Sequence, residues 1–289
     1  MILCVWNSFF AAGGLSILWQ RNYVDALADY DATRPATWFV IDRTPPEEGG
    51  RGLIARYESD PFFCFHTINA YEEASSTDPA QIDIIADLTA YENLDCIKRF
   101  YLENLVSNAP NAKAYSDPIY STCRPELRRF CLPNITNVKT ASEAPKALAI
   151  FTEAKPNTPE LPTFNPAYKS HEHRFVYGIT DTGKSSFFDG IIKYDVQNRT
   201  QIRWSVFGHT AGEPIFVADP ERPDEEDAGV LLVVVLDGLE SKSYLLVLDA
   251  KDLTEVARAD VGRVVGFGFH GTHIPSTAPR KKLPMAAVR

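Results

Sequence analysis

The sequence predicts an all-β protein with one inserted helix, and two features of its patterning carry that prediction. Most of the 289 residues fall into short apolar or alternating runs separated by turn residues, the pattern of strands joined in hairpins. Strands do not alternate with long helical segments, which a parallel α/β sheet would require. No WD dipeptide or fixed period marks a WD40-type repeat. The sequence therefore favours a propeller, a barrel or a sandwich.

The N-terminal run MILCVWNSFFAAGGLSILW is apolar, yet it does not have the features of a signal peptide or a membrane span. Its first positive charge is Arg21, after the apolar part, and polar and glycine residues interrupt it. We predict two strands here, Ile2–Trp6 and Leu15–Trp19, joined through a glycine turn. A chain seldom begins inside a buried strand, so Met1 is expected to be an internal position of a longer protein.

Further along the chain, three hairpins and one helix are predicted. The hairpins are Thr37–Thr44 with Gly52–Ser59, Gly190–Val206, and Gly229–Ala250, followed by a strand at Glu255–Val261. The apolar run at 230–236 indicates a strand buried on both faces. Apolar side chains at helical spacing predict a helix over Leu94–Val106. Residues 108–166 are rich in proline and polar residues, and we expect an irregular crossing with a few short strands.

Charge and cysteine content exclude some classes of protein. The formal net charge is −9, and no basic run offers the face that a nucleic acid partner needs. Five scattered cysteines without a C-x-x-C pair predict reduced, mostly buried thiols and a cytoplasmic location. The sequence has no candidate transmembrane segment. It also has no basic amphipathic helix, so it gives no support to peripheral membrane contact.

Two histidines stand in apolar settings that are compatible with metal binding. His270 lies between two glycines in GFGFHGTHIP, where we expect the end of an apolar strand, and His66 lies in FFCFHTINAYEE before an expected Asn-Ala turn. Each is either a satisfied core histidine or a ligand. Glu160 in PELPTFNP and Glu213 in GEPIFVADP are the matching carboxylates. They either cap surface turns or accept the N–H of a metal-bound imidazole, because a buried carboxylate needs such a partner.

Five blocks, taken in order, resolve part of this choice by resemblance. FFCFHTINAYEE, PELPTFNP, GEPIFVADPERPDEEDAGVLLVVVLDG, SYLLVLDAKDLTEVARADV and GFGFHGTHIP together resemble the C-terminal half of the carotenoid cleavage oxygenases. That family includes the lignostilbene- and resveratrol-cleaving enzymes, and the fungal branch is the most similar. The resemblance covers nearly the whole chain, which would then be one domain, 1–289, without the N-terminal half.

The resemblance implies a seven-bladed β-propeller, here incomplete, with Fe(2+) held on its axis by four histidines. It assigns His66 and His270 as the third and fourth ligands, and Glu160 and Glu213 as the carboxylates that hydrogen-bond ligand histidines. Such enzymes use dioxygen to split a C=C bond of an apolar conjugated substrate, a carotenoid, apocarotenoid or stilbene, into two carbonyl products. No catalytic residue is expected beyond the metal site.

The chain departs from that pattern because the first two ligands would precede Met1. The chain has four other histidines: His171, His173, His209 and His273. We expect them in loops or on outer faces, with His171 and His173 on one strand face. They are not expected to replace the two missing ligands. The chain by itself is therefore expected to be an inactive oxygenase, and the alternative is a catalytically dead β-rich binding module. The substrate-binding residues are unknown. Four phenylalanines either line an apolar tunnel or pack in the core: Phe62, Phe63, Phe65 and Phe267.

Overall fold

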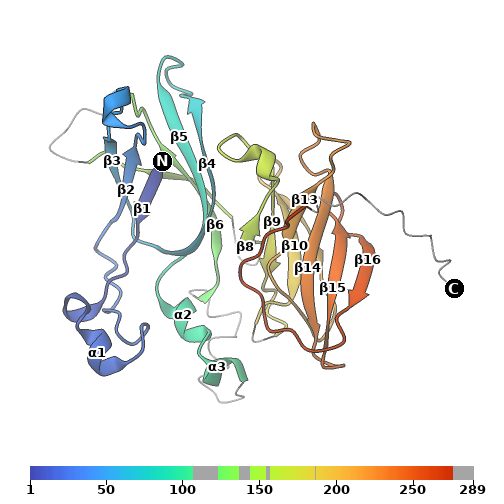
Figure 1. The fold of residues 1–289 in the computed structure, drawn as a ribbon. Coiled ribbons are helices and arrows are strands. Elements are labelled where there is room, and N and C mark those ends of the chain that lie inside the picture. Colours follow the sequence, from blue (N-terminus) through green and yellow to red (C-terminus); the bar gives the residue numbers. More distant parts are fainter. Residues whose placement is uncertain (107–122, 137–143, 154–156, 186, 276–289) are drawn as a thin grey trace.

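The computed structural model describes residues 1–106, 123–136, 144–153, 157–185 and 187–275, and these form four antiparallel sheets. The sheets follow one another along the chain and lie side by side in that order (Figure 1). The first contains β1 (Ile2–Val5), β2 (Ala36–Ile41) and β3 (Leu53–Ser59). The second contains β4 (Phe63–Ala74), β5 (Ile82–Tyr91), β6 (Glu126–Leu132) and β7 (Leu148–Thr152).

The two C-terminal sheets complete the described fold. The third contains β8 (Glu160–Thr163), β9 (Phe175–Thr180), β10 (Gly190–Asp195) and β11 (Thr200–Trp204). The fourth contains β12 (His209–Ala211), β13 (Ile215–Ala218), β14 (Gly229–Asp237), β15 (Lys242–Asp249) and β16 (Glu255–Asp260), with β12 and β13 both paired to β14. Parts of the predicted irregular crossing, at 107–122, 137–143 and 154–156, lie outside the described residues.

An apolar core lies between each sheet and the next. Trp38 of β2 packs with Phe130 of β6 in the first core. Strand β9 contributes side chains to the other two cores, because successive side chains of a strand point to opposite faces. Its Val176 belongs to a cluster with the second sheet, whereas its Tyr177 packs on Phe216 of the fourth sheet. The sheets are therefore stacked face to face in chain order.

The predicted hairpins are confirmed, with one difference in burial. β2 pairs with β3, β10 with β11, and β14 with β15, all antiparallel. The apolar run in β14 is not buried equally on both faces, since buried and half-buried residues alternate along it. Five unpaired cysteines are also found, four buried and Cys4 half-buried. Burial raises the pKa of Cys64, so this thiol stays protonated and unreactive.

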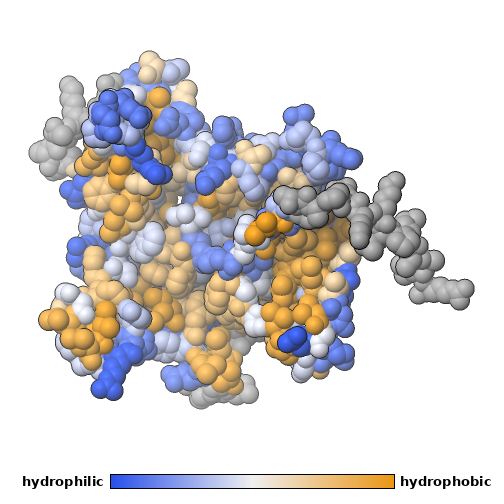
Figure 2. All heavy atoms as spheres, in the orientation of Figure 1, coloured by the Kyte–Doolittle hydropathy of each residue, from blue (hydrophilic) through white to orange (hydrophobic). Residues whose placement is uncertain are grey.

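The strand predicted at Leu15–Trp19 is wrong. The chain turns through Gly13 and Gly14, both at positive φ, into a short helix, α1 (Ser16–Gln20), and β1 pairs with β2 instead. A short apolar run fits either a strand or a helix, so periodicity could not separate the two. The apolar side chains of α1 are exposed, Leu18 at 73% and Trp19 at 61%, and apolar residues gather over this helix (Figure 2).

The single helix predicted at Leu94–Val106 is two shorter ones, α2 (Asp95–Arg99) and α3 (Leu102–Val106). The chain bends between them at Phe100 and Tyr101, and the apolar end of α3 is exposed, with Val106 at 73%. The few short strands expected within 108–166 are present as β6, β7 and β8. Within the ranges that the structure describes, no helix has the length and apolar character that a membrane span needs.

Candidate metal centre

His66 is held near the start of β4 by an irregular pairing with β5. The register shifts between Cys64 and His66 and again between Thr67 and Asn69, and such bulges re-aim side chains. His66 thus lies within a strand that continues through the Asn-Ala pair, so the turn predicted there is wrong. Its Nδ1 hydrogen-bonds Oε1 of Glu160, the first residue of β8. The contact links the second sheet to the third.

Glu160 is buried, at 3% exposure, and both of its carboxylate oxygens are used. Oε1 meets His66, and Oε2 accepts a hydrogen bond from the Tyr91 hydroxyl at 3.0 Å. The next residue, Leu161, has φ 46°, in the left-handed region that costs a non-glycine residue free energy. Burial, followed by the Glu160 charge, raises the pKa of Tyr91 well above its ordinary value, so its hydroxyl remains a donor.

His270 lies in the extended segment after β16, and not at the end of a strand as predicted, because residues 263–275 form no regular element. Its Nδ1 hydrogen-bonds Glu213 Oε1 at 3.1 Å, and the N–H of Gly271 donates to Glu213 Oε2 at 2.8 Å. The N–H of Glu213 in turn donates to Gly268 O at 3.2 Å. Glu213, between β12 and β13, therefore ties this segment to the fourth sheet.

The two imidazoles meet although the residues are far apart in sequence. The ring centroids of His66 and His270 are 5.2 Å apart, with an angle of 70° between the ring planes. Each Nδ1 faces its own carboxylate, which fixes the tautomer that carries hydrogen on Nδ1. The lone pair on each Nε2 can then bind a metal ion. This donor set fits a divalent transition metal ion, whose imidazole ligands usually make such a second hydrogen bond.

Among the residues that the structure describes, no group of three or more His, Cys, Asp and Glu side chains could hold a metal. The other histidines have different surroundings. His171 and His273 are exposed, and the Nδ1 of His209 shares a hydrogen bond of 2.7 Å with the Tyr244 hydroxyl. The HEH run precedes β9, so its predicted place on a strand face is wrong.

His173 is buried, which contradicts the prediction of a solvated histidine. It is 1% exposed, and its Nδ1 lies 3.3 Å from the Asn69 amide. Its Nε2 lies 3.3 Å from Asp87, whose carboxylate is held by two hydrogen bonds of 2.8 Å from Arg129, and Nε2 itself makes no hydrogen bond. Burial is the main cause that lowers the pKa of His173 below 6.5, with Arg129 adding to it.

We expect this burial to make stability fall as the pH drops below about 6.5, because only the unfolded chain then protonates His173 readily. Above that pH the contribution is complete, and below it the loss is at most about 1.4 kcal/mol per pH unit. Urea unfolding at about pH 7.5 and about pH 5.5 measures it. His173→Gln should shrink the pH-dependent loss, whereas His171→Gln, at an exposed position, should not. Equal behaviour of the two variants would contradict the prediction.

The four predicted phenylalanines divide into two groups. Phe62 and Phe63 are buried in the core, at 0% and 7% exposure. Phe65 is 38% exposed, beside His66, and stands 6.1 Å from the Phe100 ring. From Phe100 the ring contacts continue through Phe187 to Phe267, which precedes His270 by three residues. These ring contacts thus connect the surroundings of His66 with the segment that carries His270.

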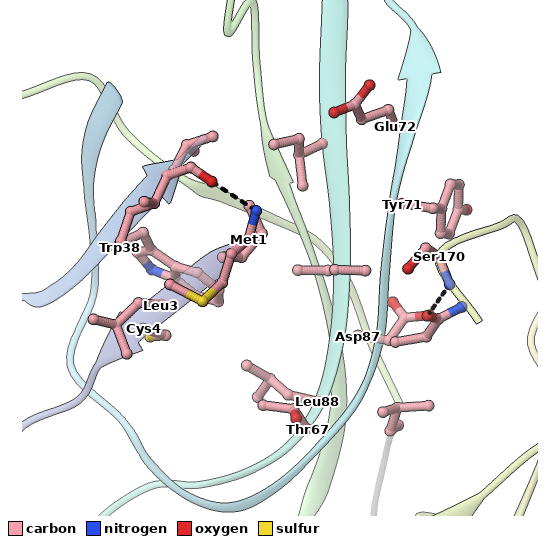
Figure 3. A pocket seen from close by; sticks show the side chains of 18 of the residues that line it. Met1, Leu3, Cys4, Trp38, Thr67, Tyr71, Glu72, Asp87, Leu88 and Ser170 are labelled. Carbon is pink, nitrogen blue, oxygen red and sulfur yellow. Dashed lines mark hydrogen bonds between the residues drawn. The ribbon is translucent and has the colours of Figure 1, made fainter. Parts of the chain in front are cut away.

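A groove of about 1100 Å³ lies elsewhere, between the first two sheets. Leu3 and Cys4 line it from the side of β1, opposite Thr67 and Leu88 of β4 and β5 (Figure 3). None of the four predicted site residues lines this groove. The histidine pair and its aromatic neighbours, and not this groove, are therefore the candidate site.

Comparison with solved structures gives the class of fold. The structure of a point mutant of apocarotenoid oxygenase from Synechocystis superposes with a TM-score of 0.68 at 20% identity, over 93% of this chain and 50% of that one. The cobalt-substituted form of the Synechocystis protein gives a TM-score of 0.67 at 22% identity, over the same shares. The described sheets thus have the fold of part of these oxygenases.

Sequence comparison gives the family. The family described as RPE65, retinal pigment epithelial membrane protein, matches residues 1–275. A carotenoid dioxygenase of Neurospora crassa is 37% identical over 96% of this chain and 46% of its own length. A torulene dioxygenase of Fusarium fujikuroi is 34% identical over 96% and 48%. The chain belongs to the carotenoid oxygenase family, as its ordered blocks predicted, and spans about half the length of these curated relatives.

Proposed function

We propose that this chain contributes half of the metal site of an iron(II) dioxygenase that cleaves a C=C bond of an apolar conjugated substrate into two carbonyl products. A carotenoid or apocarotenoid is the substrate class that the names of its relatives favour. The supporting observation is the pair of imidazoles 5.2 Å apart, each with its Nδ1 on a separate carboxylate. In this proposal the four sheets are consecutive blades of an incomplete seven-bladed propeller, which the face-to-face cores support.

In this proposal His66 and His270 hold the iron through Nε2, and Glu160 and Glu213 orient the two rings. The iron supplies dioxygen activation when bound. The protein's own part is to hold each Nδ1 proton on a carboxylate, which makes the imidazole a better donor. The rings of Phe65, beside His66, and of Phe267, three residues before His270, offer an apolar face to the substrate. Because the described residues bring no third ligand to it, we expect the chain alone to form no carbonyl products.

Metal titration of the purified chain tests the proposal. Co²⁺ is added anaerobically while histidine side-chain resonances are followed by NMR, since a paramagnetic ion broadens the resonances nearest to it. We expect His66 and His270 to broaden together, at lower Co²⁺ than the other histidines. If one ion is shared, His66→Ala should weaken the response of His270, by at least about tenfold in Co²⁺ concentration.

The exposed His171 provides the matched control, because His171→Ala removes an imidazole of similar chemistry outside the site. It should leave the response of the pair unchanged. A chain in which all six histidines respond alike, or none does, would instead support the catalytically dead binding module.

A further inference from the structure

We propose that Tyr91 is a positioning residue for the metal centre, which it serves by fixing the Glu160 carboxylate so that this carboxylate selects the tautomer of His66. The inference deepens the proposed function and rests on it. Tyr91 touches neither histidine through its hydroxyl; its hydrogen bond goes to Glu160 Oε2 at 3.0 Å, while Oε1 faces His66 Nδ1.

Strand β5 holds Pro159 and Glu160, at the start of β8, from one face. Residues 89 and 91 are two apart, so their side chains project to the same side of the strand. The Thr89 hydroxyl donates to Pro159 O at 3.0 Å, and the Tyr91 hydroxyl donates to the side chain of the next residue, Glu160. Thr89 is also the register partner of His66. One short stretch of β5 therefore positions both the histidine and its carboxylate.

The Tyr91 ring itself is fixed. It is 1% exposed, pairs in register with Phe63, and meets the Phe65 ring edge-on at 5.5 Å. A phenylalanine would fill the same apolar space, so packing does not account for the hydroxyl. A buried hydroxyl needs a partner, and here that partner is the one carboxylate oxygen that His66 leaves unused.

The two histidine–carboxylate pairs differ in this respect. The second oxygen of Glu213 is occupied by the backbone N–H of Gly271, next to His270 in the chain. Because Gly271 and His270 are adjacent in the chain, this hydrogen bond moves together with the histidine that Glu213 contacts. The second oxygen of Glu160 accepts its hydrogen bond from a side chain of another strand, Tyr91 of β5. A single conservative substitution can therefore remove this hydrogen bond.

The experiment measures the His66 tautomer in the metal-free full chain, by the nitrogen chemical shifts of the imidazole. Tyr91→Phe leaves Glu160 Oε2 without its donor, and the carboxylate can turn away from His66. We expect the ratio of the Nε2–H to the Nδ1–H tautomer to rise roughly 3- to 10-fold, as loss of one hydrogen bond allows. Tyr57→Phe is the matched control, because Tyr57 is equally buried and its hydroxyl bonds Pro133 O at 2.6 Å.

A double-mutant cycle shows whether Tyr91 acts through Glu160. In a Glu160→Ala background, which removes the side chain that joins the two residues, Tyr91→Phe should change the ratio little further. An unchanged ratio in Tyr91→Phe, or the same shift in both backgrounds, overturns the inference. If Tyr91→Phe does not fold, the wild-type Tyr91 hydroxyl proton decides: its slow exchange should be lost in Glu160→Ala, which removes its acceptor, and retained slow exchange overturns the inference.

Failure of the proposed function gives a different result. A Co²⁺ titration that singles out His66 and His270 supports the metal site, whatever the tautomer ratio of the Tyr91 variant. A shifted tautomer ratio without any selective Co²⁺ response supports the positioning role of Tyr91 and contradicts the proposed metal site.

Discussion

Replacing Asp181 with alanine should lower the free energy of unfolding by about 3–5 kcal/mol, because two buried arginines then lose the carboxylate they share. Arg99 Nη1 lies 2.6 Å from Asp181 Oδ2, and Arg124 Nε lies 3.1 Å from the same oxygen. The three side chains are only 2%, 6% and 2% exposed for Arg99, Arg124 and Asp181, so water cannot replace the lost charge.

The position of this cluster in the fold adds to the expected effect. Arg99 ends α2, Arg124 lies just before β6, and Asp181 follows β9, so one carboxylate joins the second sheet to the third. Its other oxygen accepts the N–H of Gly183 at 2.8 Å. Loss of Asp181 therefore loosens the contact between two sheets and a loop at once.

Urea unfolding at neutral pH measures the change in the free energy of unfolding. Glu255→Ala is the control, since Glu255 pairs with Arg258 through two hydrogen bonds of 2.9 and 2.8 Å at the surface. Those side chains are 38% and 41% exposed, and such a pair contributes about 0–1 kcal/mol. If the two variants unfold at the same urea concentration, the buried cluster does not have the assigned role.

The sequence predicted the strand pairs well because their information is local. Alternation and turn residues are read within one hairpin, and β2–β3, β10–β11 and β14–β15 were found that way. The strand predicted at 15–19 was wrong because a five-residue apolar segment is too short to show a period. Its surroundings in the fold made it a helix.

The same distinction between local sequence information and distant contacts applies to the residues of the candidate site. His66, Glu160, Glu213 and His270 were singled out by their apolar neighbours and by the order of five blocks, and the structure brings them together in pairs. Tyr91 was missed because YENLD carries no local mark of its hydrogen bond to a residue 69 positions away. The burial of His173 was missed likewise, since its neighbour Asp87 lies on β5, far away in the sequence.

Gly178→Ala should disturb the candidate site most directly, through the backbone of β8. A Cβ at position 178 would lie 2.5 Å from Glu160 O and 2.7 Å from Pro159 Cβ. Those atoms are backbone or fixed proline ring, and Leu161 at φ 46° already leaves β8 little freedom to move. We expect a loss of about 1–3 kcal/mol in the free energy of unfolding, as in other overpacked sites.

The same substitution should also weaken the His66–Glu160 hydrogen bond, because β8 is pushed away from β9 and takes the carboxylate with it. Urea unfolding and the nitrogen shifts of His66 measure the two effects. Gly266→Ala is the control: a Cβ there meets nothing within 4 Å, although the residue precedes His270 by only four positions. A Gly178→Ala chain as stable as the control, with an unchanged His66, would show that β8 adjusts freely and that the close approach at Gly178 does not fix Glu160.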